Sequence, residues 1–274
     1  MYPILDAHTH VYPERIALRA ATNLADFYHF TVAESGTFEG LLACDKKAGI
    51  GGMLLLPVAT SWKNVDKIND SAAAWADLAR RAGFLAWAFG SVNAECPDLT
   101  AVLAHIRSLG LKGIKLHPDL QGEAVDSPRL YPVYERMEEW GMRLYLHVGD
   151  DRPTVDGSSP ERVVNVAKAF PNLSICAAHL GGYRVWDRAE QVIMGRYDNI
   201  WYDCSSTLYA MDKTRGKALI ERCGVDRVFF GSDYPAISPE TALREFDALD
   251  FDETARKAIL HDNLLRFLGE DPNV

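Results

Sequence analysis

The chain has 274 residues, 48% of them hydrophobic and 24% charged, which excludes a mainly disordered protein. Its net charge of −9 disfavours nucleic acid or an anionic membrane as the main partner. The longest apolar run, residues 53–59, is far shorter than the roughly 20 residues that span a bilayer, and the start MYPILDAHTH lacks the basic segment of a signal peptide. We therefore expect a soluble, cytoplasmic protein whose partner is a small molecule, and a homodimer stays open.

Cysteine usage is typical of a reducing compartment. The cysteines are odd in number and show no C-x-x-C spacing, which predicts free thiols rather than a disulfide framework or a cysteine zinc site. They are Cys44, Cys96, Cys176, Cys204 and Cys223.

Eight short apolar runs alternate with segments that carry helix signals. The runs cover residues 4–8, 52–58, 84–92, 113–116, 143–148, 173–179, 200–204 and 227–231. Most are continuously apolar, as expected of parallel strands covered on both faces. Helices are predicted over 66–81 and 97–110, after the serine–proline starts at 127–128, 159–160 and 238–239, and over 252–268. This alternation predicts an α/β fold, a (β/α)8 TIM barrel, as a single domain over residues 1–274.

The connection after the first predicted strand is the longest. Residues 11–36 separate His10 from the next clear helix and contain basic and aromatic side chains, among them Arg15 and Tyr28. A long connection after a barrel strand lies on the catalytic face. The segment is therefore either a lid over the substrate or a short extra helix packed on the barrel rim.

Polar side chains gather at the carboxyl ends of the predicted strands, where barrel enzymes keep their chemistry. They are Asp6, His8 and His10 on the first strand, Lys115 and His117 on the fourth, His147 on the fifth, His179 on the sixth, Asp203 on the seventh and Asp233 on the eighth. Because side chains alternate along a strand, Asp6, His8 and His10 are expected to share one face. Imidazole and carboxylate groups suit zinc, manganese or iron, so we predict a metal site with one position open for water. Asp6 would orient an imidazole or brace the barrel core.

Four motifs stand at these strand ends in chain order: Asp6-Ala7-His8-Thr9-His10, Leu144-Tyr145-Leu146-His147, Ala177-Ala178-His179-Leu180-Gly181-Gly182 and Gly231-Ser232-Asp233-Tyr234-Pro235. Together they resemble the amidohydrolase superfamily, in the amidohydrolase-related branch that includes aminocarboxymuconate semialdehyde decarboxylase, other nonoxidative decarboxylases and lactonases. The resemblance implies one divalent ion, zinc before manganese or iron, surrounded by His8, His10, His147 and Asp233. It further implies that His179 activates a metal-bound water and that Asp233 takes a proton from that water in hydrolytic members.

Lys115 raises the question of a second ion. Two-metal members of the superfamily hold a carboxylated lysine on the fourth strand that bridges both ions, whereas the string over 113–118 also resembles one-metal relatives. We expect one metal, with Lys115 and His117 contacting the substrate or supporting the ligands. A charged lysine in a barrel mouth needs an anionic partner, either a substrate carboxylate or a neighbouring aspartate.

Three functions are compatible with this site. The first expectation is a metal-dependent hydrolase that attacks a small amide or lactone with metal-activated water. The alternative is a nonoxidative decarboxylase, a carboxy-lyase that uses the same ligands on a small aromatic or muconate-type acid. A non-catalytic barrel that binds a metabolite is least favoured, because a binder gains nothing from an open metal position. A serine triad built on Ser205 or Ser206 is disfavoured because neither lies in a nucleophile-elbow sequence.

Basic residues follow several strands of this acidic chain, and they predict a substrate that carries a carboxylate. They are Arg15, Arg19, Lys63, Lys115, Arg152 and Arg184. Arg184, just past the Gly181-Gly182 turn, is the predicted anchor of that carboxylate, and Trp186 is a predicted substrate contact.

Overall fold

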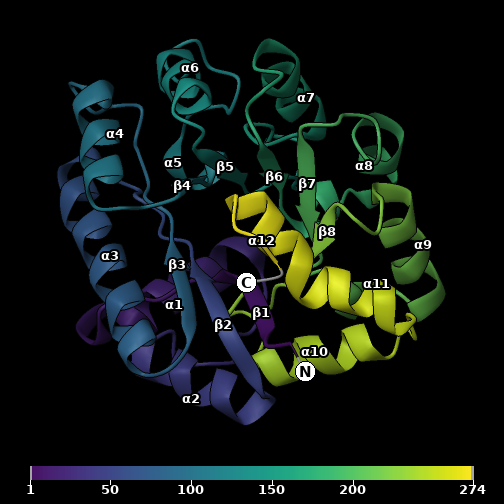
Figure 1. Cartoon of the computed structure of the whole chain (residues 1–274). Helices are drawn as coiled ribbons and strands as arrows, with labels where there is room; N and C mark the ends of the chain where they lie inside the picture. Colours follow the sequence, from purple (N-terminus) through teal and green to yellow (C-terminus); the bar gives the residue numbers. More distant parts are fainter. Residues whose placement is uncertain (1, 273–274) are drawn as a thin grey trace.

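Eight parallel strands surround one centre and helices lie outside them in the computed structural model, which describes residues 2–272 (Figure 1). The strands are β1 (Ile4–Thr9), β2 (Ile50–Leu55), β3 (Leu85–Ala88), β4 (Gly113–Leu116), β5 (Arg143–Leu146), β6 (Ile175–Ala177), β7 (Ile200–Asp203) and β8 (Val228–Phe229). They pair in the orders β1-β2-β3 and β4-β5-β6-β7-β8. Parallel bridges between Gly90 and Ile114 and between Thr9 and Tyr234 join these two sheets at both edges. The predicted (β/α)8 barrel is therefore confirmed.

Most strands end earlier than the apolar runs that predict them. The run over 84–92 forms a strand only over Leu85–Ala88, and the run over 173–179 only over Ile175–Ala177. The residues that follow turn into the barrel mouth, where they make contacts other than strand pairing. Ser91, for example, donates its hydroxyl to the carbonyl of Lys115 and receives the backbone N–H of Ala59. Apolar composition thus predicts where a strand lies but not where its pairing stops.

Helices begin at the serine–proline pairs 159–160 and 238–239 as predicted, but the pair at 127–128 does not start a helix, because the next helix begins only at Tyr131. The helices are α1 (Glu14–Tyr28), α2 (Phe38–Ala48), α3 (Val65–Arg81), α4 (Leu99–Ser108), α5 (Pro118–Gln121), α6 (Tyr131–Glu139), α7 (Pro160–Ala169), α8 (Trp186–Val192), α9 (Lys213–Cys223), α10 (Pro239–Asp247), α11 (Glu253–Lys257) and α12 (Asn263–Leu268). Asp98 and Ser238 accept backbone N–H bonds at the starts of α4 and α10. The continuous helix predicted over 252–268 is interrupted by a π-helical turn at Ala258–Asp262. No helix among residues 2–272 is long and apolar enough to span a membrane.

The long first connection forms a helix, α1, of 15 residues. The extra helix of the two alternatives is thus present and longer than expected, while the lid role stays a prediction. The carboxyl end of α1 is fastened to the segment after β5, because the Arg152 guanidinium donates to the Phe27 carbonyl at 3.1 Å and lies 4.2 Å from the centre of the Phe27 ring. Asp150 holds Arg152 in place by accepting two hydrogen bonds from its guanidinium and one from its backbone N–H. This attachment places Tyr28 over the barrel mouth.

The hydrophobic core has two parts. A larger cluster lies between the barrel and its outer helices and includes Met53, Leu55 and Ile114. A smaller cluster fills the barrel interior with Leu5, Ala7, Leu54, Phe89, Tyr145 and Phe229, together with Leu264, Phe267 and Leu268 of α12. Helix α12 lies across the strands in Figure 1 and closes the interior at one end. The opposite end, where the strands finish, is left for polar side chains.

Gly113 tests how tightly β4 and β5 pack. A Cβ atom added at this glycine would lie 2.0 Å from the Arg143 carbonyl oxygen. We expect Gly113→Ala to lower the free energy of unfolding by about 1–3 kcal/mol, because the strands must separate to admit it. Denaturant unfolding measures this change. In the control Gly216→Ala, the added methyl meets the flexible end of the Leu208 side chain and improves helix propensity, so stability should stay within about 1 kcal/mol. Equal effects at the two sites would contradict the packing account.

Candidate metal centre

Three buried or nearly buried side chains converge at the carboxyl end of the barrel. His8 and His10 come from the end of β1, and Asp233 follows β8. The Nε2 atoms of the two histidines lie 3.1 Å apart, and each lies 3.5 Å from Oδ1 of Asp233. These three atoms form one of two groups that could hold a metal ion in the described part of the chain, and the other consists of His8, His179 and Asp203. The structure thus brings together three of the four predicted ligands.

Hydrogen bonds determine which nitrogen of His8 and of His10 carries the proton, and in both imidazoles they leave Nε2 free to bind a metal. Nδ1 of His8 lies 2.9 Å from a carboxylate oxygen of Asp203, and Nδ1 of His10 lies 2.6 Å from the Leu56 carbonyl oxygen. Both partners only accept hydrogen bonds, so each Nδ1 carries the proton and each Nε2 presents a lone pair. Two lone pairs that face each other at 3.1 Å repel unless a cation lies between or beside them. The donor set therefore fits a divalent ion with nitrogen and oxygen ligands.

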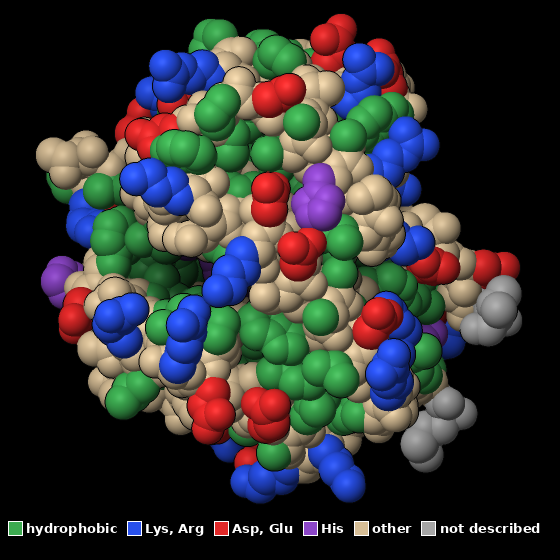
Figure 2. Space-filling model, turned by 90° about the vertical axis from the view of Figure 1, so that its left-hand side faces the viewer, with side chains coloured by type: hydrophobic (Ala, Val, Ile, Leu, Met, Phe, Trp, Pro, Cys, Tyr) green, Lys and Arg blue, Asp and Glu red, His purple; other side chains and the backbone are tan. Residues whose placement is uncertain are grey.

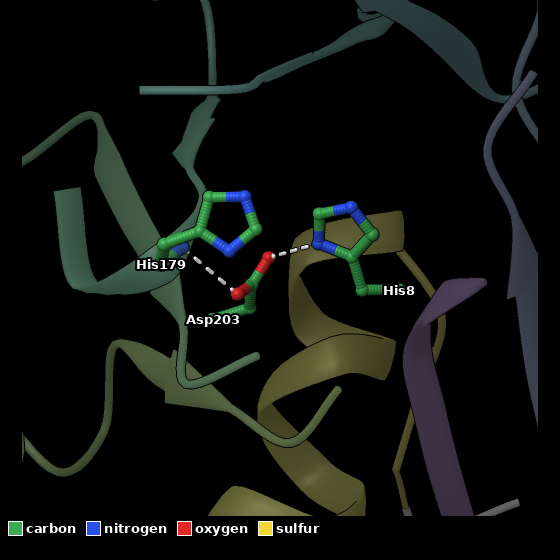
Figure 3. A group of neighbouring side chains, drawn as sticks. All are labelled: His8, His179 and Asp203. Carbon is green, nitrogen blue, oxygen red and sulfur yellow. Dashed lines mark hydrogen bonds and ion pairs between the residues drawn. The ribbon is translucent and has the colours of Figure 1, made fainter. Parts of the chain in front are cut away.

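The carboxylate of Asp203 organises this arrangement, although the sequence only placed it at a strand end and assigned it no role. Figure 3 shows it between His8 and His179, with Oδ2 toward the His8 ring and Oδ1 toward the backbone N–H of His179. Tyr145 and Ser205 donate their hydroxyls to it as well. Burial alone would raise its pKa, but the contacts with His8 and Ser205 lower the pKa well below the usual value. Its position at the end of the seventh predicted strand was the available sequence signal.

Lys115 lies beside the ligand group. Its side chain is fully buried, with Nζ 3.2 Å from Nε2 of His8 and 4.8 Å from the centre of the Tyr145 ring. Burial lowers the pKa of Lys115 to about 8, although the negative charges of Asp203 and Asp233 raise it in part. Burial, together with the nearby Lys115 charge, lowers the pKa of His8 to about 3, so this imidazole is neutral at physiological pH and able to bind a metal.

His147, the fourth predicted ligand, takes part in a different set of contacts. Its Nδ1 lies 3.0 Å from Nε2 of His179, and its Nε2 lies 2.9 Å from the hydroxyl of Tyr28. The same hydroxyl lies 2.9 Å from Nε2 of His117, whose ring stacks on His147 with 4.0 Å between centroids. His179 is oriented by the Ser205 carbonyl, 3.0 Å from its Nδ1. The four side chains form a continuous chain of contacts, and sequence reasoning did not single out Tyr28 for it.

Asp6 acts on the backbone rather than on an imidazole. Its Oδ1 accepts the N–H groups of His8 and Ser232, which links β1 to the segment after β8, while its Oδ2 has no partner among the described residues. The register of β1 on β2 shifts between Asp6 and Thr9. Strict alternation therefore does not hold over this stretch, and the expectation that Asp6, His8 and His10 share one face needs correction. Of the two predicted roles, Asp6 has the contacts of a brace.

A central cavity of about 310 Å³ opens onto the histidines. Its lining includes Lys115, His117, His179 and Asp233 of the predicted site, with Tyr28 and Tyr183 beside them. Arg184 and Trp186 do not line it. The Arg184 side chain is directed to the surface near Asp151, 3.9 Å away, and the Trp186 indole donates to the His179 carbonyl. The structure thus gives no support to a substrate-anchoring role for these two residues.

A second cavity of about 590 Å³ lies between α1 and α3 and shares His10 and His117 with the central one. Arg15 and Lys67 line it, and no carboxylate from residues 2–272 does. The face that carries α3 and α4 is hollowed in Figure 2, with hydrophobic side chains inside the hollow and Lys and Arg side chains around it. We call this second space the side cavity.

Backbone strain is concentrated at the metal centre. His179, Ser206 and Asp233 all have positive φ values, of 59°, 45° and 68°, a region that residues other than glycine rarely adopt. Conformations of this kind persist where surrounding contacts hold them and are frequent at functional sites. Here the Ser206 hydroxyl donates to Asp233, and the Asp233 N–H donates to the His8 carbonyl at 2.8 Å. Strain and ligands therefore share the same strand ends.

These observations define an α/β-barrel enzyme with a metal-ligand group at the carboxyl ends of its strands. The model of the amidohydrolase family matches residues 5–269, and the chain belongs to that family.

Similar proteins include several decarboxylases. The chain is 28% identical over 223 residues to a 2-amino-3-carboxymuconate-6-semialdehyde decarboxylase of Dictyostelium discoideum, a match that covers 67% of this chain and 61% of that protein. Among solved structures, an uncharacterized TIM-barrel protein from Bordetella bronchiseptica shares 22% identity at a TM-score of 0.80, covering 98% of this chain and 99% of that one. A 5-carboxyvanillate decarboxylase from Sphingomonas paucimobilis shares 15% identity at a TM-score of 0.75, covering 98% and 100%. The structural matches show the fold.

Asp203→Asn tests whether this carboxylate prepares His8 for the metal. An amide nitrogen facing Nδ1 of His8 would move the imidazole proton to Nε2 and remove the lone pair from the ligand group. We expect zinc affinity to fall about 10- to 100-fold, measured by competition with a chromophoric chelator. Asp187→Asn is the control, because the Asp187 side chain is 91% exposed and pairs with Arg215 rather than with a histidine of the site. Unchanged zinc affinity in a folded Asp203→Asn protein would contradict the assignment.

Proposed function

We propose that this enzyme is a metal-dependent, nonoxidative decarboxylase that removes carbon dioxide from a small acid. This is the alternative of the two enzymatic expectations. Hydrolysis of an amide or lactone has less support, because the curated relative from Dictyostelium discoideum and the similar structure from Sphingomonas paucimobilis are both decarboxylases. The chain spans 61% of the length of its curated relative, so the substrate of that relative is not carried over here.

The observation that carries this proposal is that apolar side chains line much of the central cavity, and that Lys115 lies at its metal-ligand end. The central cavity is lined by Leu24, Phe30, Ala33, Ala236 and Ile237, with Lys115 as the cation among the described lining residues. A carboxylate placed there loses much of its hydration, and its conversion to neutral carbon dioxide removes a poorly solvated charge. Hydrolysis of a neutral amide or lactone instead develops negative charge on the substrate, which apolar walls do not stabilise. The basic residues of the side cavity, Arg15 and Lys67, favour approach of an anion from solvent.

The residues of the site have different proposed roles. His8, His10 and Asp233 would hold one divalent ion, zinc before manganese or iron, and when bound it supplies Lewis-acid polarisation of a substrate oxygen. Lys115 holds the departing carboxylate by its charge. As the carbon–carbon bond breaks, its electron pair stays on the substrate carbon, carbon dioxide leaves, and a proton takes its place.

His179 is the proposed source of that proton. Its Nδ1 is held by the Ser205 carbonyl, which leaves Nε2 as the position where a proton is gained or given. The contacts from His179 through His147 and Tyr28 to His117 reach the cavity lining. This chain can return a proton to His179 after turnover.

The test is a substrate panel with carbon dioxide release as the readout. Aromatic and muconate-type acids, lactones and amides are each incubated with zinc-loaded protein. We expect carbon dioxide from at least one acid, loss of activity after chelation, and recovery with zinc, manganese or iron. Turnover of a lactone or amide without any carbon dioxide from the acids would contradict the proposal.

Two lysine variants sharpen this test. Lys115→Met should lower kcat/KM about 10- to 150-fold, because it removes a charged contact worth roughly 1.5–3 kcal/mol. Lys112→Met is the matched control, since Lys112 lies just before β4 and pairs with Glu270 at the surface. An equal effect of the two variants would remove Lys115 from the mechanism.

A further inference from the structure

Helix α10 presents a polar face to the central cavity. Ser238, at its amino cap, and Thr241 and Glu245 within it all line this cavity. Their spacing of three and four residues places them on one side of a helix. The neighbouring lining residues Ala236 and Ile237 are apolar. The carboxylate of Glu245 is thus the charged group on the face that α10 presents to the cavity.

Glu245 lacks a hydrogen-bond or ion-pair partner in the described part of the chain. Among residues 2–272, no hydrogen bond or ion pair engages its carboxylate, whereas Glu240 of the same helix pairs with Lys47 at 2.6 Å. Burial raises the pKa of Glu245, and the nearby Arg244 only partly offsets that effect. A charge left uncompensated at a cavity wall is stabilised when a ligand brings a hydrogen-bond donor to it.

Charged side chains therefore line the central cavity from two parts of the fold. Lys115 and Asp233 lie at the metal-ligand group, and Glu245 lines the cavity from α10. A bound acid that directs its reacting carboxylate to Lys115 extends its remaining substituents along the apolar wall. A donor group that reaches Glu245 gains a charge-assisted hydrogen bond, and a second carboxylate at that position meets a like charge.

We propose that Glu245 selects the substrate: it accepts a hydrogen bond from an amino or hydroxyl group of a small acid and excludes acids that carry a second carboxylate there. The substrate class is then a monocarboxylic acid with a donor substituent. This inference rests on the proposed function for the orientation of the reacting carboxylate. It adds a specificity residue that lies outside the ligand group.

The test compares ligand binding in Glu245→Leu, Glu245→Gln and wild-type protein. Zinc-loaded protein is titrated in a calorimeter with benzoates that carry an amino, hydroxyl, methyl or second carboxylate group at position 3 or 4. Wild-type protein should bind an amino- or hydroxybenzoate about 10- to 100-fold more tightly than the methylbenzoate of the same pattern. Glu245→Leu should lose this preference and admit the dicarboxylate, whereas Glu245→Gln, which keeps an acceptor oxygen, should retain part of the preference and also admit the dicarboxylate.

The control and the readout separate this inference from the proposed function. Glu240→Gln changes an exposed carboxylate of the same helix and should bind the panel as wild-type protein does. Because binding is measured rather than turnover, the donor preference is scored whether or not carbon dioxide is released. A Glu245→Leu protein with the wild-type order of affinities would overturn the inference, as would wild-type protein that shows no preference for donors.

Discussion

The contact between His8 and Asp203 is the interaction on which the rest of the site depends. A buried carboxylate is stable only when several donors surround it, and Asp203 receives the His8 imidazole, the Tyr145 and Ser205 hydroxyls and the His179 N–H. These donors come from β1, β5, and the segments after β6 and β7. One carboxylate thereby fixes strands that are distant in sequence and sets the tautomer of a metal ligand. The same contacts therefore hold the strand ends together and prepare the metal ligand.

The charge distribution of the metal centre follows from the burial of neutral imidazoles next to charged side chains. Two imidazole lone pairs and the Asp233 carboxylate face a common region with Lys115 at its edge. Burial and the charge of Lys115 lower the pKa of His8, which keeps its imidazole neutral and able to bind a metal. The Lys115 ammonium also lies 3.2 Å from Nε2 of His8, where it competes with a metal for the lone pair. An ion at the centre would remove that competition and leave Lys115 free for a substrate anion. Under the two proposals, Lys115 binds the reacting carboxylate of the substrate and Glu245 binds its donor group, and both residues line the same cavity.

Sequence predicts the parts of this site that local patterns determine. Apolar runs and caps locate the strands and helices, and the strand ends identify His8, His10, His179 and Asp233 because a parallel barrel brings such ends together. Tyr28 and Glu245 lie on helices whose approach to the mouth depends on tertiary contacts, such as the Arg152 attachment of α1. No periodicity encodes that approach.

Two departures have local causes. The shift in register between Asp6 and Thr9 defeats simple alternation on β1, and only the pairing with β2 reveals it. Arg184 follows a glycine pair that turns the chain, and its own backbone is left-handed with φ of 60°, so its side chain extends toward Asp151 at the surface instead of the cavity. A basic residue near a strand end in sequence is therefore a weak guide to the lining of a cavity.

The most direct test of the account is a crystal structure of the zinc-loaded protein with anomalous diffraction recorded at the zinc edge. The account predicts one principal peak about 2.0–2.2 Å from Nε2 of His8, Nε2 of His10 and a carboxylate oxygen of Asp233, with Asp203 still bound to Nδ1 of His8. A peak bound instead by Asp203 and His179, or zinc that binds away from the strand ends, would contradict it.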